Sequence, residues 1–150
     1  MYFCSGSTSF LGDGRVITSM PTGDGGNTAW TPNTGSRWAA VDEVPHTSDT
    51  DYISSGTSSQ RDAFTFAPLG VTGAIKAVVL GLVGRKDDAG TRQVRSTVRR
   101  GSTNYDGSVV LSLPTTYQRF DGDVMTVDPS DAGAWTVADV DASEFGVVTV

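Results

Sequence analysis

The side chains best suited to chemistry in this 150-residue chain are its one histidine and its paired carboxylates. His46 lies in a polar stretch with no cysteine and no second histidine nearby. A Ser-His-Asp relay would have to be assembled from distant parts of the chain, and the G-x-S-x-G turn that presents a nucleophilic serine does not occur. We therefore interpret His46 as an exposed loop histidine.

Paired carboxylates about 5 to 10 Å apart could hydrolyse a glycosidic bond. The acidic pairs of this chain all lie among turn-forming residues, where aspartate is common for conformational reasons. The pattern selects none of them, so we expect no enzyme and no catalytic residue, with a polysaccharide hydrolase as a remaining alternative. The pairs are Asp42-Glu43, Asp49/Asp51, Asp87-Asp88, Asp121/Asp123 and Asp139/Asp141.

Cofactor and metal signatures are absent from the sequence. Cys4 is the only cysteine, which excludes an internal disulfide and a cysteine-based zinc site. The glycine-rich stretch 21–27 carries Asp24 but lacks the ligand spacing of a calcium loop. No phosphate-binding or dinucleotide-binding motif occurs. We expect no cofactor and no metal.

The stretch around which the chain is organised is the apolar run Ala74 to Arg85. Its Val and Leu content favours a strand, and its glycines disfavour a helix. The turn-forming sequence KDDAGT follows, and then residues 92–100 alternate. Arg95 and Arg99 share one face of this second segment, opposite Val94 and Val98. The two segments predict a long β-hairpin with a buried first arm and a basic face on the second.

Turn signals at regular intervals divide the rest of the chain into short strands. We expect strands at 15–20, 60–67, 108–113, 116–128 and 144–150, and an unstructured loop at 21–27. Thr136 and Asp139 are spaced to cap a single helical turn. The pattern predicts an all-β, jelly-roll-like β-sandwich of about 8–10 strands with at most one short helical turn. Residues 1–9 are predicted to be a flexible arm, and residues 10–150 a single domain.

Charge is distributed unevenly along the chain. The formal net charge is −6, but seven of the eleven basic residues lie between Lys76 and Arg100, where only two acidic residues oppose them. The acidic total disfavours nucleic acid as a partner, and no apolar stretch approaches the ~20 residues that cross a bilayer. The basic segment is either a solvated strand face or one half of a head-to-tail contact between copies.

Trp30 and Trp38 lie eight positions apart on either side of a turn. Such a pair could stack on a sugar ring, although Trp more commonly packs because it buries a large area. We favour packing and keep glycan binding as the alternative.

A set of short motifs, in this order, resembles a group of small tailed-phage virion proteins. The segment Arg85 to Arg92, RKDDAGTR, carries the strongest likeness, which extends over nearly the whole chain from Phe10 onward. The other motifs are Phe10 to Asp13 with Arg15-Val16, Trp30 to Pro32, Trp38 with Val41 to Glu43, Asp51 to Ile53, Tyr105 to Gly107, Asp128-Pro129, Ala134 to Thr136 and Glu144 to Val147.

This resemblance implies a non-enzymatic structural role and a jelly-roll sandwich. We expect a capsid cement or decoration protein on the outer surface of the virion, with the major capsid protein and copies of itself, as a trimer, for partners. The expected contact residues are Tyr2 and Phe3 in the arm and Arg95 and Arg99 on the basic strand face. The alternative is a tail or fibre-associated sandwich that binds host glycan.

Overall fold

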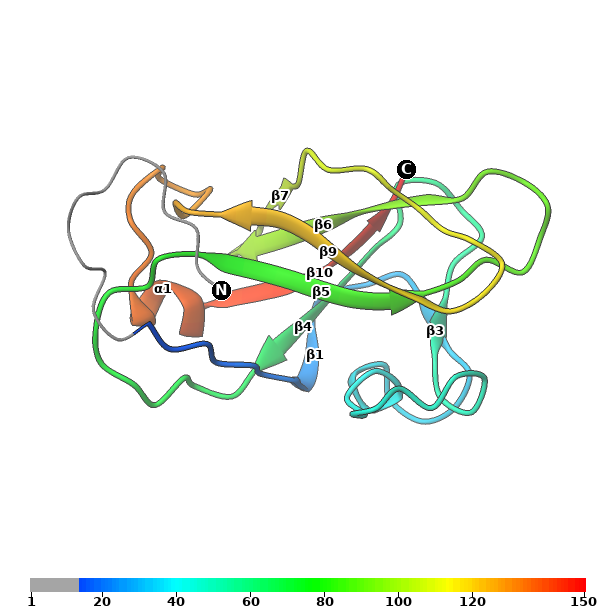
Figure 1. Cartoon of the computed structure of the whole chain (residues 1–150), viewed down its shortest axis with the longest axis horizontal. Coiled ribbons are helices and arrows are strands. Elements are labelled where there is room, and N and C mark those ends of the chain that lie inside the picture. Colours follow the sequence, from blue (N-terminus) through cyan, green and yellow to red (C-terminus); the bar gives the residue numbers. More distant parts are fainter. Residues whose placement is uncertain (1–13) are drawn as a thin grey trace.

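The computed structural model describes residues 14–150, and these form an all-β protein (Figure 1). Helical structure in this part is limited to the 3-10 turn η1 and the five-residue helix α1. The strands are β1 (Pro21–Thr28), β2 (Thr31–Pro32), β3 (Ile53–Ser54), β4 (Arg61–Phe66), β5 (Val78–Gly84), β6 (Gln93–Arg100), β7 (Thr103–Asp106), β8 (Leu111–Ser112), β9 (Gln118–Met125) and β10 (Ser143–Thr149), with η1 at Trp38–Ala40 and α1 at Val137–Asp141.

The strands pair antiparallel in three sheets of unequal size. The largest has six strands in the order β1-β4-β10-β6-β7, with β8 also paired to β6. β5 and β9 form a separate two-stranded sheet, and β2 and β3 another. The C-terminal strand β10 lies between β4 and β6, so the centre of the large sheet joins segments that are far apart in sequence.

The β5–β9 sheet packs across the large sheet and makes the protein a β-sandwich, as predicted (Figure 1). The buried centre consists of Val98 on β6, Phe145 on β10 and Trp135 before α1. Val78 and Leu80 of β5 and Met125 of β9 pack against it. The two sheets lie close together at Gly122 of β9, where an added Cβ would lie 3.0 Å from Ser96 on β6.

The predicted hairpin between residues 74–85 and 92–100 is wrong. β5 pairs with β9, and β6 pairs with β10, β7 and β8, so the two segments lie in different sheets. The hairpin that does form joins β6 to β7 through Gly101, whose φ of 58° suits glycine, in a segment predicted only to turn. β5 is also not covered on both faces, since Val79 and Val83 are 45% and 41% exposed.

The glycine-rich stretch predicted as a loop is the strand β1, which pairs with β4. Its register breaks between Asp24 and Thr28, where the strand bulges. A Cβ on Gly25 would lie 2.7 Å from the Ala63 carbonyl oxygen, so only glycine allows this approach to β4. Tertiary packing, which local sequence does not encode, therefore overrides the loop signal here.

Other expectations are confirmed at the level of single elements. The strand expected at 60–67 is present as β4; its Phe64 is buried, and its Phe66 packs on the core and meets the Phe145 ring edge-on at 5.8 Å. Thr136 and Asp139 form the predicted capping box of α1, with each side chain bonded to the other's main-chain N–H. Residues 15–20, in contrast, form no strand. The predicted arm, residues 1–9, lies outside the described residues.

Candidate binding cleft

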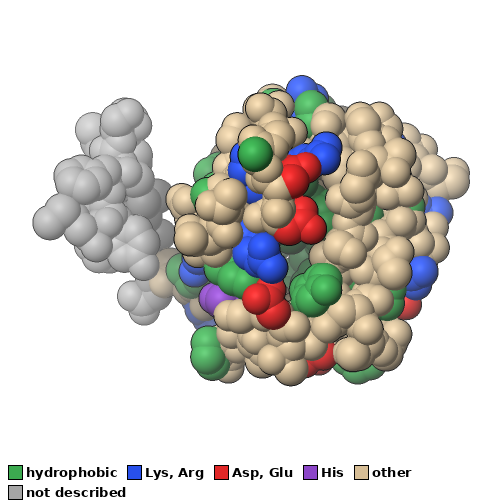
Figure 2. All heavy atoms as spheres, turned by 90° about the vertical axis from the view of Figure 1, so that its right-hand side faces the viewer, with side chains coloured by type: hydrophobic (Ala, Val, Ile, Leu, Met, Phe, Trp, Pro, Cys, Tyr) green, Lys and Arg blue, Asp and Glu red, His purple; other side chains and the backbone are tan. Residues whose placement is uncertain are grey.

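A cleft of about 2050 Å³ opens between the β5–β9 sheet and the six-stranded sheet. Its walls include the whole of β5, Phe64 and Phe66 of β4, and Phe145 of β10, and residues 14–20 run along it. Figure 2 looks toward one end of the molecule, where apolar side chains are visible inside a hollow and charged side chains lie along one side of it. The arrangement suits an apolar or polypeptide occupant more than a small charged substrate.

A polar cluster at the mouth ties the loop before β3 to the ends of β5 and β9. The Asp49 carboxylate accepts hydrogen bonds from Arg85 Nη2 at 2.8 Å and from the Tyr117 hydroxyl at 2.7 Å. Arg85 also lies over the Tyr117 ring, 5.2 Å from its centroid. The bonds from Arg85 and Tyr117 hold the pKa of Asp49 below its usual value. The cluster therefore places an ion pair at the mouth.

His46 belongs to this cluster by stacking alone. It is exposed, and its ring centroid lies 5.3 Å from that of Tyr117. Within residues 14–150 no hydrogen bond joins it to a serine or a carboxylate, so the geometry of a nucleophilic relay is not assembled around it there. The prediction of an exposed loop histidine agrees with this position.

The two predicted contact arginines lie on the same face of β6 but differ in their surroundings. Arg99 Nη1 is 2.9 Å from Glu144 Oε1, and Glu144 Oε2 accepts a hydrogen bond from the N–H of Gly26. Arg95 is half-buried, and its Nε has no hydrogen-bond partner within the described residues. The charge of Arg99 is thus neutralised within the chain. Tyr2 and Phe3, the other two predicted contact residues, lie outside the described residues.

The basic segment as a whole is largely paired with the chain's own carboxylates. The structure satisfies the charges internally, which weakens the idea of a free basic pole and favours the solvated-face interpretation. Four of its seven basic residues make such pairs: Arg85 with Asp49, Arg92 with Asp88, Arg99 with Glu144, and Arg100 with Asp128 and Asp139.

Trp30 and Trp38 are both partly buried. The Trp30 indole N–H donates to the Gln60 carbonyl at 3.2 Å, and the Trp38 main-chain N–H donates to Asp24 Oδ1 at 2.8 Å. These contacts match the packing role that the sequence favours, because they fix both residues within the fold.

A buried carboxylate, Asp62, is not among the acidic pairs that the sequence singles out. Asp62 on β4 is 0% exposed, and within the described residues neither of its oxygens has a hydrogen-bond partner. Arg37 Nε lies 3.7 Å from it. Burial raises the pKa of Asp62 to about 7, while Arg37 acts in the opposite direction. A signal existed, because strand alternation places Asp62 on the same face as Phe64 and Phe66.

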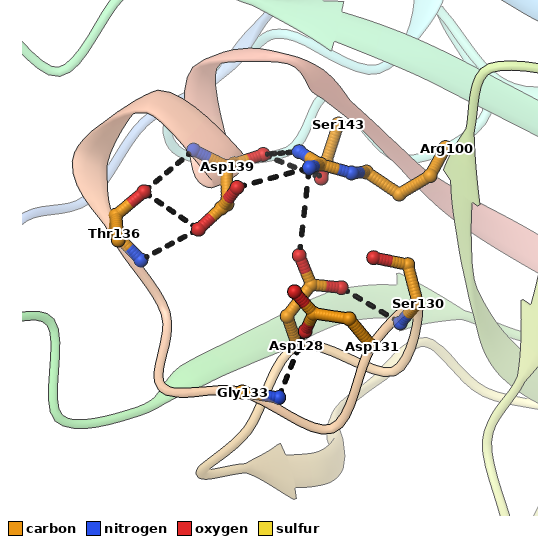
Figure 3. A network of polar contacts seen from close by, with 8 residues as sticks. All are labelled: Arg100, Asp128, Ser130, Asp131, Gly133, Thr136, Asp139 and Ser143. Atoms are coloured by element: carbon orange, nitrogen blue, oxygen red, sulfur yellow. Dashed lines mark hydrogen bonds and ion pairs between the residues drawn. The ribbon is translucent and has the colours of Figure 1, made fainter.

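A second buried carboxylate, Asp128, belongs to a network that joins β6, α1 and the loop before α1 (Figure 3). Arg100 Nη2 lies 3.6 Å from Asp128 Oδ2 and 2.9 Å from Asp139 Oδ1. Asp128 Oδ1 accepts the N–H of Ser130, and the Ser143 hydroxyl bonds the Asp139 carbonyl. Because Arg100 and the main chain occupy these carboxylates, the network serves to hold the loop and α1 against the sheet.

The described residues contain no group of three or more His, Cys, Asp or Glu side chains placed to hold a metal ion. No helix in residues 14–150 is long and apolar enough to cross a membrane. Comparisons of the chain with protein-family models, with characterised proteins and with solved structures found no match.

Proposed function

We propose that this chain is a non-enzymatic structural protein of a tailed-phage virion, a capsid cement protein that binds the assembled shell on its outer surface. The proposal starts from the ordered motifs that resemble small virion proteins. It is supported by a sandwich whose charged groups are mostly engaged with one another and which carries a large, mainly apolar cleft.

The apolar cleft is the observation that carries the proposal. A protein that acts alone would gain from filling a cleft of about 2050 Å³, because apolar surface is more stable away from water. A subunit of an assembly can leave such surface for a neighbour. Large apolar side chains are also exposed on the outer face of the β5–β9 sheet, namely Val79, Val83 and Val124.

The motif with the strongest family likeness supports a structural role. RKDDAGTR connects β5 to β6 and therefore links the two sheets. Asp88 accepts hydrogen bonds from Arg92 and from the N–H of Gly90, and Lys86 donates to the Gly90 carbonyl. These polar groups bond to one another, which supports a role for the motif in specifying the conformation of the loop.

The proposed mechanism is passive. Each copy buries surface across a seam between major capsid subunits, and copies associate with one another, as a trimer at local three-fold positions. A protein that binds only the assembled shell stabilises it by mass action. Shells that carry the protein should therefore release their contents at a higher temperature than shells without it, and the increase should depend on protein concentration.

The internal pairing of Arg99 changes how the proposed contact face must be tested. Arg99→Glu would place two carboxylates together at Glu144 and disturb the sheet. The charge swap Arg99→Glu with Glu144→Arg keeps the pair but reverses the orientation of its charges, and Arg95→Gln removes the half-buried charge beside it. We expect both variants to fold and to bind shells at least about tenfold more weakly, a loss of about 1.4 kcal/mol. Wild-type affinity in both would remove this face from the proposal.

The proposal also has to be separated from the tail alternative. A glycan array probed with the purified protein would show saturable, sugar-specific binding if the protein recognises a host surface. We expect no such binding, because Trp30 and Trp38 are partly buried. Saturable glycan binding together with no effect on shell stability would replace the capsid role with the tail role.

A further inference from the structure

We infer that copies of this chain associate by strand addition, in which the segment Arg15 to Met20 of one copy pairs with the free edge of β5 in another. The inference deepens the self-association part of the proposed function and names the surface that carries it. It rests on two unpaired features that lie along the same cleft.

The first feature is the edge of β5. Within the described residues β5 pairs only with β9, so its other edge has main-chain groups without a strand partner. The sequence of β5 is VVLGLVG, with no charge and no proline. Proteins commonly protect exposed edges with charges or proline, and an unprotected edge is a template for another strand. The neighbouring strand β9 carries Arg119, Asp121 and Asp123 and is less suited to this role.

The second feature is the segment Arg15 to Met20, RVITSM. Its β-branched residues predict a strand, yet it forms none within one copy. Val16 is 83% exposed and Ile17 is 39% exposed. A segment with strand propensity, exposed apolar side chains and no partner in its own chain is suited to complete a sheet elsewhere.

The lengths and charges of the two features match. Six residues of strand span about 20 Å and the seven of β5 about 23 Å. β5 carries no charged side chain, and Arg15 is the one charged residue of the segment Arg15 to Met20. An uncharged strand edge beside an apolar cleft fits the uncharged residues Val16 to Met20 of a second copy.

Site-specific cross-linking tests the contact directly. In a Cys4→Ser background, one copy carries Val16→Cys or Ile17→Cys, and a second copy with a different tag carries Val79→Cys. Neighbouring residues of a strand point to opposite faces, so only one of the two segment positions should form an intermolecular disulfide with position 79. Val127→Cys, at an exposed position outside the cleft, is the matched control in the second copy and should form none. Equal cross-linking from both segment positions, or none, would overturn the inference.

The oligomeric state provides a second test that uses no capsid shells. Sedimentation should give a wild-type mass above that of one chain, and Ile17→Asp should weaken self-association by at least about tenfold, because a charge is introduced at the strand edge. Val109→Asp, at a position 40% exposed and outside the cleft, should leave it unchanged. Circular dichroism of Ile17→Asp should match wild type, since this side chain packs in no strand.

A wild-type protein that is monomeric throughout, or an oligomer that Ile17→Asp leaves intact, would refute strand addition whether or not the protein binds shells. An oligomer that depends on residue 17 but does not bind shells would uphold the inference and refute the capsid role. The two failures are therefore distinguishable.

Discussion

The buried carboxyl of Asp62 should make the stability of this protein fall as pH rises through the neutral range. A group whose pKa is raised on folding binds its proton more tightly in the folded state. Stability is then greatest below the unfolded pKa of 3.8 and declines until the pH passes the folded pKa of about 7. Replacing Asp62 with Asn removes the titration and should remove this decline.

The size of the effect follows from the difference between the two pKa values. The shift from 3.8 to about 7 corresponds to about 4 kcal/mol in total, of which about 2.5 kcal/mol falls between pH 5 and pH 8. The carboxyls whose pKa is lowered on folding change the stability in the opposite direction, because they add stability as the pH rises through about 4. This gain is complete below pH 5. These carboxyls are Asp49, Asp88, Asp106, Asp123 and Asp139.

Urea unfolding followed by tryptophan fluorescence measures the effect, because Trp135 is buried in the core. Relative to Asp62→Asn, the wild-type protein should lose about 2.5 kcal/mol of unfolding free energy between pH 5 and pH 8. Asp121→Asn, at a side chain 61% exposed, is the control and should keep the wild-type slope. A wild-type minus Asp62→Asn difference that stays constant within about 0.5 kcal/mol would refute the reasoning.

Two substitutions test the packing and the buried ion pairs. In thermal unfolding, Gly146→Ala should destabilise the protein by about 3 kcal/mol, because its Cβ would lie within 2 Å of a β4 carbonyl oxygen. Gly56→Ala is the control, because nothing lies within 4 Å of its Cβ, and it should change stability by less than about 1 kcal/mol. Arg100→Met should cost about 3 kcal/mol in urea unfolding, because it leaves Asp128 buried and unpaired. Arg119→Met, which removes an ion pair exposed to solvent, is the control. A loss for Arg100→Met no greater than that for Arg119→Met would show that the network adds little.

The sequence predicts those parts of the fold whose signals are local. Alternation identifies β4 with Phe64 and Phe66, and the spacing of Thr136 and Asp139 identifies the cap of α1. The all-β class follows from the same kind of pattern. Each of these features depends on residues within a few positions of one another, so no knowledge of the tertiary structure is needed.

The features that the sequence misses are set by contacts between distant segments. Proximity in sequence suggests a hairpin of β5 with β6, but the apolar faces of these strands are buried on opposite sides of the sandwich interior. β1 is hidden because Gly25 is required by the approach to Ala63, which no local rule anticipates. The same holds for the candidate site, since the cleft and the Asp49–Arg85–Tyr117 cluster at its mouth join three separate parts of the chain.

The capsid role is tested most directly by co-sedimentation of the purified protein with mature shells that lack it. The proposal predicts saturable binding at many copies per shell, with a stoichiometry that reports the symmetry position occupied. The same shells disassembled into capsid subunits should bind far less, because the proposed seam exists only after assembly. No binding to shells that electron microscopy shows to be intact would contradict the proposed function.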